Sequence, residues 1–166
     1  MAAARTYVSE LRDRTERAGR ELIYTGNRVL DSLLMDKLSV AKGAGVQVEQ
    51  ELALGRTLKM ANVDCCTLFG NALDNALEGC WQMERARRQM VVRLKLTGNM
   101  LHADIENTSP PPTEQSGVGF ATTKADKKRH GIGMKNIERV VAAYDGVWTA
   151  GFGHGWFRLR CLLCGV

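Results

Sequence analysis

One amphipathic helix constrains the fold of this 166-residue chain more than any other feature. Between Leu68 and Trp81 apolar residues recur with helical spacing, and Asn62 or Asp64 is a suitable N-cap. The apolar face consists of Leu68, Phe69, Ala72, Leu73, Ala76, Leu77, Cys80 and Trp81. A helix with one continuous apolar face has to pack against another layer of structure.

The other segments predict the layer on which this helix packs. Helices are expected over residues 5–21, 29–43 and 133–144, and strands over 45–52, 90–97, 100–107, 147–149 and 156–163. Gly98 and Asn99 suit a tight hairpin turn between the second and third strands. This order indicates a two-layer α/β (α+β) sandwich, in which helices cover one face of a mixed, mostly antiparallel sheet.

Residues 108–131 form a long connection that is rich in Pro and Gly and has no apolar period. A loop of this length inside a compact domain is usually functional or mobile, and we interpret it as a lid.

Composition argues against several functional classes. The formal net charge is only +5, and aromatic residues are 6% of the chain, so the sequence does not favour nucleic-acid binding. The basic clusters are Arg85, Arg87 and Arg88, interpreted as a solvated helix end, and Lys124, Lys127, Lys128 and Arg129. No stretch reaches the ~18 apolar residues of a membrane span, and the charged start does not resemble a signal peptide. We therefore expect a cytoplasmic segment without membrane contact.

The cysteines predict a reducing environment. Their number, five, is odd, and the CxxC at Cys161 and Cys164 lies on an expected strand. Residues three apart on a strand point to opposite faces, so we expect core packing there and not a zinc or redox site.

The polar face of the strongest helix carries Asn71, Asp74, Asn75 and Glu78 at i, i+3, i+4 and i+7. Such a row offers oxygen ligands to a hard cation such as Mg²⁺. The alternative is a solvated stripe, but Asn is a poor helix former that such a stripe would tend to avoid.

The motif HGIGMKN opens the last expected helix. Gly131 and Gly133 allow close approach of a ligand, and a helix start offers free N–H groups to an anion. The preceding basic loop makes phosphate the natural ligand, although taken alone the glycines could be simple loop punctuation.

The segments FGNALDNALEG, IENTS and FATTKADKKRHGIGMKNIERVVAAYDG, in this order and spacing, resemble the ATP-binding domain of sensor histidine kinases. These kinases share a superfamily with DNA gyrase, the heat-shock chaperones and the mismatch-repair MutL proteins. YTGNRVLDSLLMDKLSVAKGAGV extends the likeness, which is closest to the peptide-sensing, quorum-type kinases of Gram-positive bacteria. The resemblance covers residues 20–163. It implies a Bergerat ATP-binding fold at 27–166, with a lid at 108–131, after the end of a dimerisation-type helix at 1–26.

The resemblance also implies an ATP and Mg²⁺ site. Asn75 is the expected Mg²⁺ ligand, Asn71 a phosphate-side amide, and Lys124 and His130 further catalytic residues. The implied ATP-binding set is Asn71, Asp74, Asn75, Glu78, Asn107, Phe120, Thr122, Thr123, Lys124, His130, Gly131, Ile132, Gly133 and Met134. Asn107 stands where the family usually has an Asp, a departure that the quorum-type subfamily shares, and an uncharged amide binds the adenine amine more weakly.

Position 71 also bears on the reaction. ATP-hydrolysing relatives have a Glu four residues before the Mg²⁺ ligand, whereas this chain has Asn71. Neutral imidazole needs no strong base, so a histidine acceptor is favoured. None of His102, His130 and His154 lies in an acceptor context.

The resemblance therefore implies the catalytic domain of a protein-histidine kinase in two-component signalling. Its expected partners are the dimerisation and phosphoacceptor domain of the same kinase and a response regulator. The whole kinase is expected to be a membrane-anchored sensor. The alternative is a degenerate nucleotide-binding module that regulates a partner without phosphoryl transfer.

Overall fold

The computed structural model describes residues 23–111 and 127–166, with the backbone alone at 127–131. The elements are α2 (Arg28–Gly43), β1 (Gln47–Ala53), α3 (Asn62–Trp81), the short helix η1 (Arg85–Arg87), β2 (Gln89–Thr97), β3 (Met100–Thr108), α4 (Lys127–Ala143), β4 (Val147–Gly153) and β5 (Trp156–Cys164). The helix expected at 5–21 and most of the expected lid lie outside the described residues.

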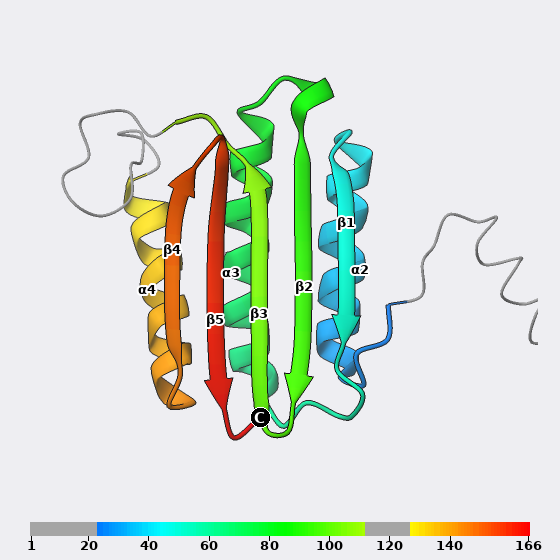
Figure 1. Ribbon diagram of the computed structural model, residues 1–166, viewed down its shortest axis with the longest axis vertical. Coiled ribbons are helices and arrows are strands. Elements are labelled where there is room, and N and C mark those ends of the chain that lie inside the picture. The colour runs from blue at the N-terminus through cyan, green and yellow to red at the C-terminus, as the bar shows by residue number, and fades with distance from the viewer. Residues whose placement is uncertain (1–22, 112–126) are drawn as a thin grey trace, which may run out of the picture.

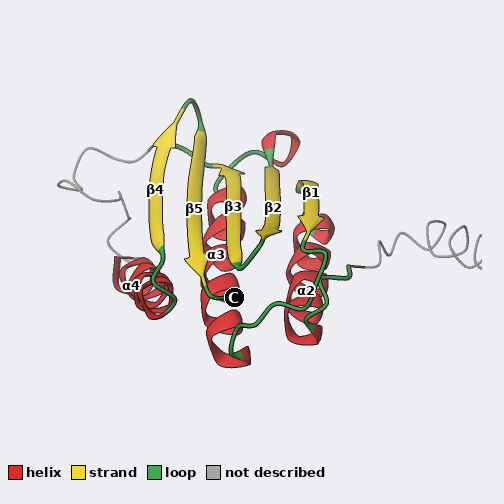
Figure 2. Ribbon diagram, turned by 60° about the horizontal axis from the view of Figure 1, so that its bottom comes forward, coloured by secondary structure: helices red, strands yellow, loops and turns green. Residues whose placement is uncertain are grey.

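Five strands form one mixed sheet in the order β1-β2-β3-β5-β4. Only β1 and β2 are parallel, and the chain crosses between them through α3. The β2–β3 hairpin turns at Gly98, whose φ of 59° suits glycine. The helices all pack on one face, with α3 behind the centre of the sheet, α2 behind β1 and α4 behind β4 (Figures 1 and 2). The predicted two-layer sandwich is confirmed.

The core lies between the helices and the sheet because each element has one apolar face. Met90, Val92 and Leu94 alternate along β2 and are at most 1% exposed. On α3, Phe69 and Leu73 are fully buried against this layer, as their spacing predicts. Trp81 was expected on the same apolar face, but its side chain is 47% exposed.

The helices α2 and α3 differ in how their N-termini are capped. Asn27 caps α2 as its side-chain Oδ1 accepts from the N–H groups of Val29 and Leu30, both at 3.0 Å. The N-cap of α3 is Ala61, without a side-chain cap, so the prediction of Asn62 or Asp64 was wrong. The Asp64 carboxylate instead accepts from the Tyr144 hydroxyl at 3.0 Å.

The last helix begins earlier than the sequence pattern suggests. We expected it near Gly133, but α4 begins at Lys127, so Gly131 and Gly133 lie within the helix and not before it. Lys, Lys, Arg and His at 127–130 can all extend a helix, and a helical glycine costs only about 1 kcal/mol.

Arg88 does not belong to a solvated helix end, contrary to prediction. Its guanidinium donates to the carbonyl of Met83 at 3.1 Å and to that of Ala44 at 2.8 Å. A third contact of 3.5 Å reaches the carbonyl of Trp81. Arg88 therefore joins the end of α3 to the turn after α2, and the planar fork of arginine makes this possible.

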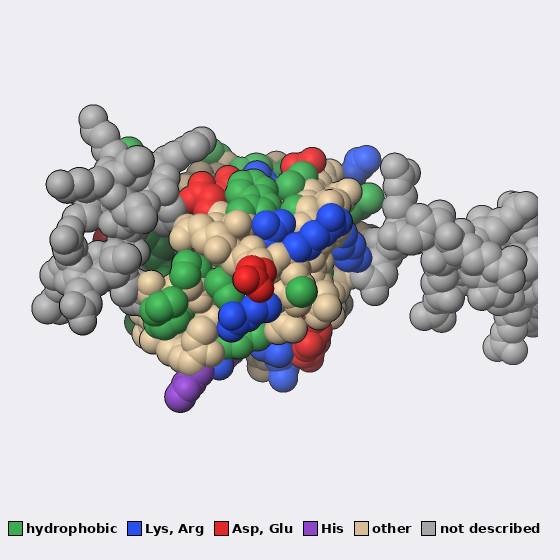
Figure 3. Space-filling model, turned by 90° about the horizontal axis from the view of Figure 1, so that it is seen from above, with side chains coloured by type: hydrophobic (Ala, Val, Ile, Leu, Met, Phe, Trp, Pro, Cys, Tyr) green, Lys and Arg blue, Asp and Glu red, His purple; other side chains and the backbone are tan. Residues whose placement is uncertain are grey.

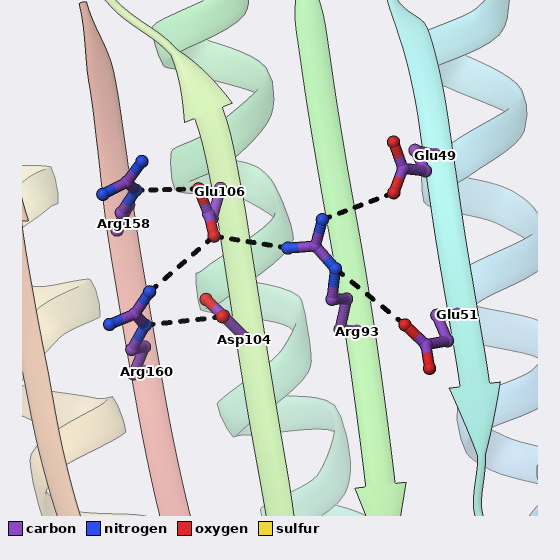
Figure 4. Close-up of polar contacts among 7 residues, drawn as sticks. All are labelled: Glu49, Glu51, Arg93, Asp104, Glu106, Arg158 and Arg160. Carbon is purple, nitrogen blue, oxygen red and sulfur yellow. Dashed lines mark hydrogen bonds and ion pairs between the residues drawn. The ribbon is translucent and has the colours of Figure 1, made fainter. Parts of the chain in front are cut away.

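The face of the sheet without helices carries charges of alternating sign (Figure 4). The Arg93 guanidinium of β2 forms ion pairs of 3.3 Å with Glu49 of β1 and with Glu106 of β3. Arg158 of β5 donates to the same Glu106 at 2.8 Å. Opposite charges on neighbouring strands stabilise the pairing and keep this uncovered face polar.

The end of the domain at which η1 lies shows a mixture of basic, acidic and apolar side chains (Figure 3). Among the described helices, none is long and apolar enough to span a membrane.

Candidate functional site

The polar face of α3 lines a pocket of about 370 Å³. Asn71, Asp74, Asn75 and Glu78, the row singled out from the sequence, all contribute to its wall. The rest of the lining is Lys37 of α2, Trp81 at the end of α3, and Gly133 and Met134 of α4. Three helices that are far apart in the sequence therefore meet at one site.

Asn71 connects α3 to α4 at one end of the pocket. Its Nδ2 donates to the Thr67 carbonyl one turn earlier, at 2.6 Å. A Cβ added at Gly133 would lie 3.1 Å from Asn71 Oδ1, which is a tight contact. Glycine at position 133 thus lets the backbone of α4 approach the amide row closely.

Asp74 connects α3 to α2. The Lys37 ammonium lies 2.6 Å from Asp74 Oδ1, and the two side chains are 24% and 53% exposed. This ion pair places a positive charge in a wall that otherwise carries the carboxylates of Asp74 and Glu78.

Asn107 lies near the other end of α3, on the sheet side of the helix. It is 1% exposed, and its Nδ2 donates to the Thr108 carbonyl at 3.0 Å. Its Oδ1 is buried without a hydrogen-bond partner among the described residues. An unpaired buried oxygen is costly, so this atom is an acceptor that still lacks a donor in the described part of the chain.

The sequence profile of the GHKL domain family matches residues 60–164. The chain belongs to the GHKL domain family. Comparison with curated protein sequences finds no match.

Solved histidine kinases share the fold of this GHKL domain. The catalytic domain of the histidine kinase ThkA has 12% identity and a TM-score of 0.63, with 88% of this chain and 97% of that chain covered. The histidine kinase domain of a blue-light-activated kinase from Erythrobacter litoralis EL346 has 12% identity and a TM-score of 0.59, with coverage of 88% and 65%. Full-length ShkA in complex with AMPPNP has 15% identity and a TM-score of 0.58, and this chain spans only 40% of it.

The GHKL domain brings six of the implied binding residues to the pocket. They are Asn71, Asp74, Asn75, Glu78, Gly133 and Met134. Ile132 is 56% exposed, and neither it nor Asn107 is in the lining. Phe120, Thr122, Thr123 and Lys124 lie outside the described residues, as does the side chain of His130, and only the backbone of Gly131 is described. Part of the implied binding set therefore lies at one pocket. The binding and catalytic roles of all these residues stay predictions.

Two lining residues were missed by sequence reasoning. Trp81 was counted with the core because its position continues the apolar period of α3. Lys37 lies directly before Leu38, which is 3% exposed and part of the core face of α2. The sequence showed only that Lys37 lies at the edge of the apolar stripe of α2. It could not show that Asp74 of α3 would be its partner, because that contact depends on tertiary packing.

The donor set of the pocket suits a hard cation held jointly with a ligand. Among the described residues, no three His, Cys, Asp or Glu side chains converge as a metal site. The wall instead offers amide oxygens and two carboxylates, and Mg²⁺ commonly takes one or two protein oxygens and completes its shell with phosphate and water.

Proposed function

We propose that this GHKL domain binds ATP with Mg²⁺ and transfers the γ-phosphoryl group to a histidine of a dimerisation helix in the same kinase. The observation that carries the proposal is the pocket in which the amide and carboxylate row of α3 faces Gly133 and Met134 of α4. A response regulator would receive the phosphoryl group downstream, and this domain would be the cytoplasmic part of a membrane-anchored sensor.

The dimensions of the site support a nucleoside triphosphate. Asn71, beside Gly133, and Gly79, beside Asn107, are separated by about 12 Å along the axis of α3. Phosphates placed at the Asn71 end would leave the base near Asn107. The unpartnered Oδ1 of Asn107 can there accept from an exocyclic amine, which is the group that adenine offers.

Asn75 is the residue we assign to Mg²⁺. It is half-buried on the pocket wall, between Asn71 and Glu78, and its side-chain oxygen is a ligand type that Mg²⁺ accepts. When bound, the ion neutralises charge on the phosphates during phosphoryl transfer.

The local chemistry at Asn71 supports histidine as the acceptor. An amide cannot remove a proton from water or from a hydroxyl group, and the Asn71 Nδ2 is already donating to Thr67. A neutral imidazole carries a lone pair at pH 7 and needs no such base. The protein then contributes positioning and electrostatic stabilisation, the two main terms in phosphoryl transfer.

Asn107 supports a second candidate, a nucleotide-binding module without transfer activity. Its uncharged amide is a weaker partner for an adenine amine than a carboxylate would be. Such a module would bind nucleotide weakly and regulate a partner by its bound or empty state.

Calorimetric titration with ATP in Mg²⁺ and in EDTA tests the shared part of both candidates. We expect binding that needs Mg²⁺, and its absence at millimolar ATP would refute a nucleotide site. Transfer of phosphate to an added dimerisation domain then separates the kinase from the binding module.

A further inference from the structure

Lys37 is the only lysine or arginine among the described residues of the pocket lining. The other charged groups in this wall are the carboxylates of Asp74 and Glu78. A triphosphate entering a wall with two carboxylates would be repelled at close range unless a cation stood nearby. Lys37 supplies that charge from α2, which lies outside residues 60–164, where the family profile matches.

An ion pair with Asp74 holds the Lys37 ammonium at the pocket wall. Its side chain is 24% exposed, and the Nζ lies 2.6 Å from Asp74 Oδ1. Asp74 directly precedes Asn75, the residue assigned to Mg²⁺, and follows Asn71 by one turn. An ammonium has three N–H donors, so the contact with Asp74 leaves donors for a ligand.

A purely structural tether between α2 and α3 is the competing explanation. Partly exposed ion pairs contribute little to stability, typically ~0–1 kcal/mol. The tether would therefore be weak, while the same ammonium beside a phosphate chain would form a charge-assisted hydrogen bond. The pocket location distinguishes Lys37 from ordinary surface lysines.

We infer that Lys37 binds the phosphate chain of the nucleotide and that Asp74 holds its ammonium group in place. This inference rests on the proposed nucleotide site and adds a phosphate contact from α2. The helix α2 thereby becomes part of the binding site, and a movement of α2 relative to α3 would change nucleotide affinity.

The test compares ligands that differ in their phosphates. Wild type, Lys37→Met, Lys37→Arg and the control Lys95→Met, which removes an exposed lysine of β2, are titrated with adenosine, AMP and MgATP. We expect Lys37→Met to weaken MgATP binding about tenfold or more, the size of one charge-assisted hydrogen bond, and to leave adenosine binding unchanged. Lys37→Arg should retain most of the affinity, and Lys95→Met all of it.

A double-mutant cycle separates a phosphate contact from a tether. If Lys37 touches phosphate, Lys37→Met still weakens MgATP binding in an Asp74→Asn background. If it only holds Asp74, the second substitution adds nothing, and the inference is overturned. Equal losses for adenosine and MgATP, or no loss for either, overturn it as well. Failure of the wild type to bind any nucleotide would instead overturn the proposed function, and this inference with it.

Discussion

Gly79 of α3 lies directly against the side-chain amide of Asn107 on β3. A Cβ added at position 79 would come within 2.3 Å of Asn107 Nδ2, closer than real Cβ contacts. The glycine therefore sets how near the helix approaches the end of β3. It also leaves room for the amide whose Oδ1 we assign to the base of the nucleotide.

Gly79→Ala should destabilise the fold because Asn107, only 1% exposed, has little space to rotate away. Overpacking of this kind costs about 1–3 kcal/mol, which thermal or urea unfolding would measure. Gly70→Ala is the matched control, since a Cβ there meets nothing within 4 Å on the same helix. That variant should be neutral or more stable by up to ~1 kcal/mol. Equal stability of the two variants would contradict the close contact.

Asn75→Ala should abolish Mg²⁺-dependent ATP binding while the domain stays folded. The side chain is half-buried on the pocket wall and lies outside the apolar core, so its loss removes a ligand and not a core contact. Calorimetry in Mg²⁺ reports the binding, and circular dichroism reports the fold. Asn62→Ala, an exposed amide at the start of α3, is the control. Wild-type ATP affinity in Asn75→Ala would show that the Mg²⁺ ligand lies elsewhere.

Burial raises the pKa of the Cys161 thiol from its ordinary 9.0 to about 12. The unfolded chain loses this proton at lower pH than the folded chain does. This difference in pKa contributes to the free energy of unfolding. The contribution is fully present below pH 9 and is lost as the pH rises toward 12. Urea unfolding at several pH values should show a shallower alkaline decline for Cys161→Ala than for wild type. Cys66→Ala removes an exposed thiol and should keep the wild-type slope; identical slopes for all three proteins would argue against a buried, protonated Cys161.

The local parts of the site could be predicted from the sequence, whereas the tertiary ones could not. Asn71, Asp74, Asn75 and Glu78 share a pocket wall because helical periodicity alone puts them on one face. Lys37 joins them only through the packing of α2 on α3, and no spacing in the sequence encodes that contact.

Arg88 and the start of α4 show the same limit. A basic residue after a helix is usually solvated, but Arg88 finds carbonyl partners at Ala44 and Met83, which the fold brings together. At α4, glycine was interpreted as a helix boundary, although the modest cost of a helical glycine let the helix extend back to Lys127.

This chain alone, given ATP and Mg²⁺, should not phosphorylate itself on histidine. His102 is exposed on β3 between the buried Leu101 and Ala103, so it points to the sheet face away from the helices and their pocket. His154 lies in the β4–β5 turn with a φ of 53°, and His130 lies on α4. Neither His102 nor His154 therefore lies on a helix, and α4, which carries His130, packs within this domain against α3 and β4.

A supplied dimerisation helix that carries the acceptor histidine should be phosphorylated by this chain, although slowly. Productive transfer needs the imidazole nitrogen in line with the leaving oxygen, and such positioning can contribute ~7–11 kcal/mol to lowering the barrier. A detached helix loses much of this advantage, so the rate should rise when helix and domain are joined covalently. Radiolabelled ATP followed by acid treatment measures the transfer, which should disappear with Asn75→Ala. Acid-labile phosphate on the isolated chain would instead show that one of its own histidines is the acceptor.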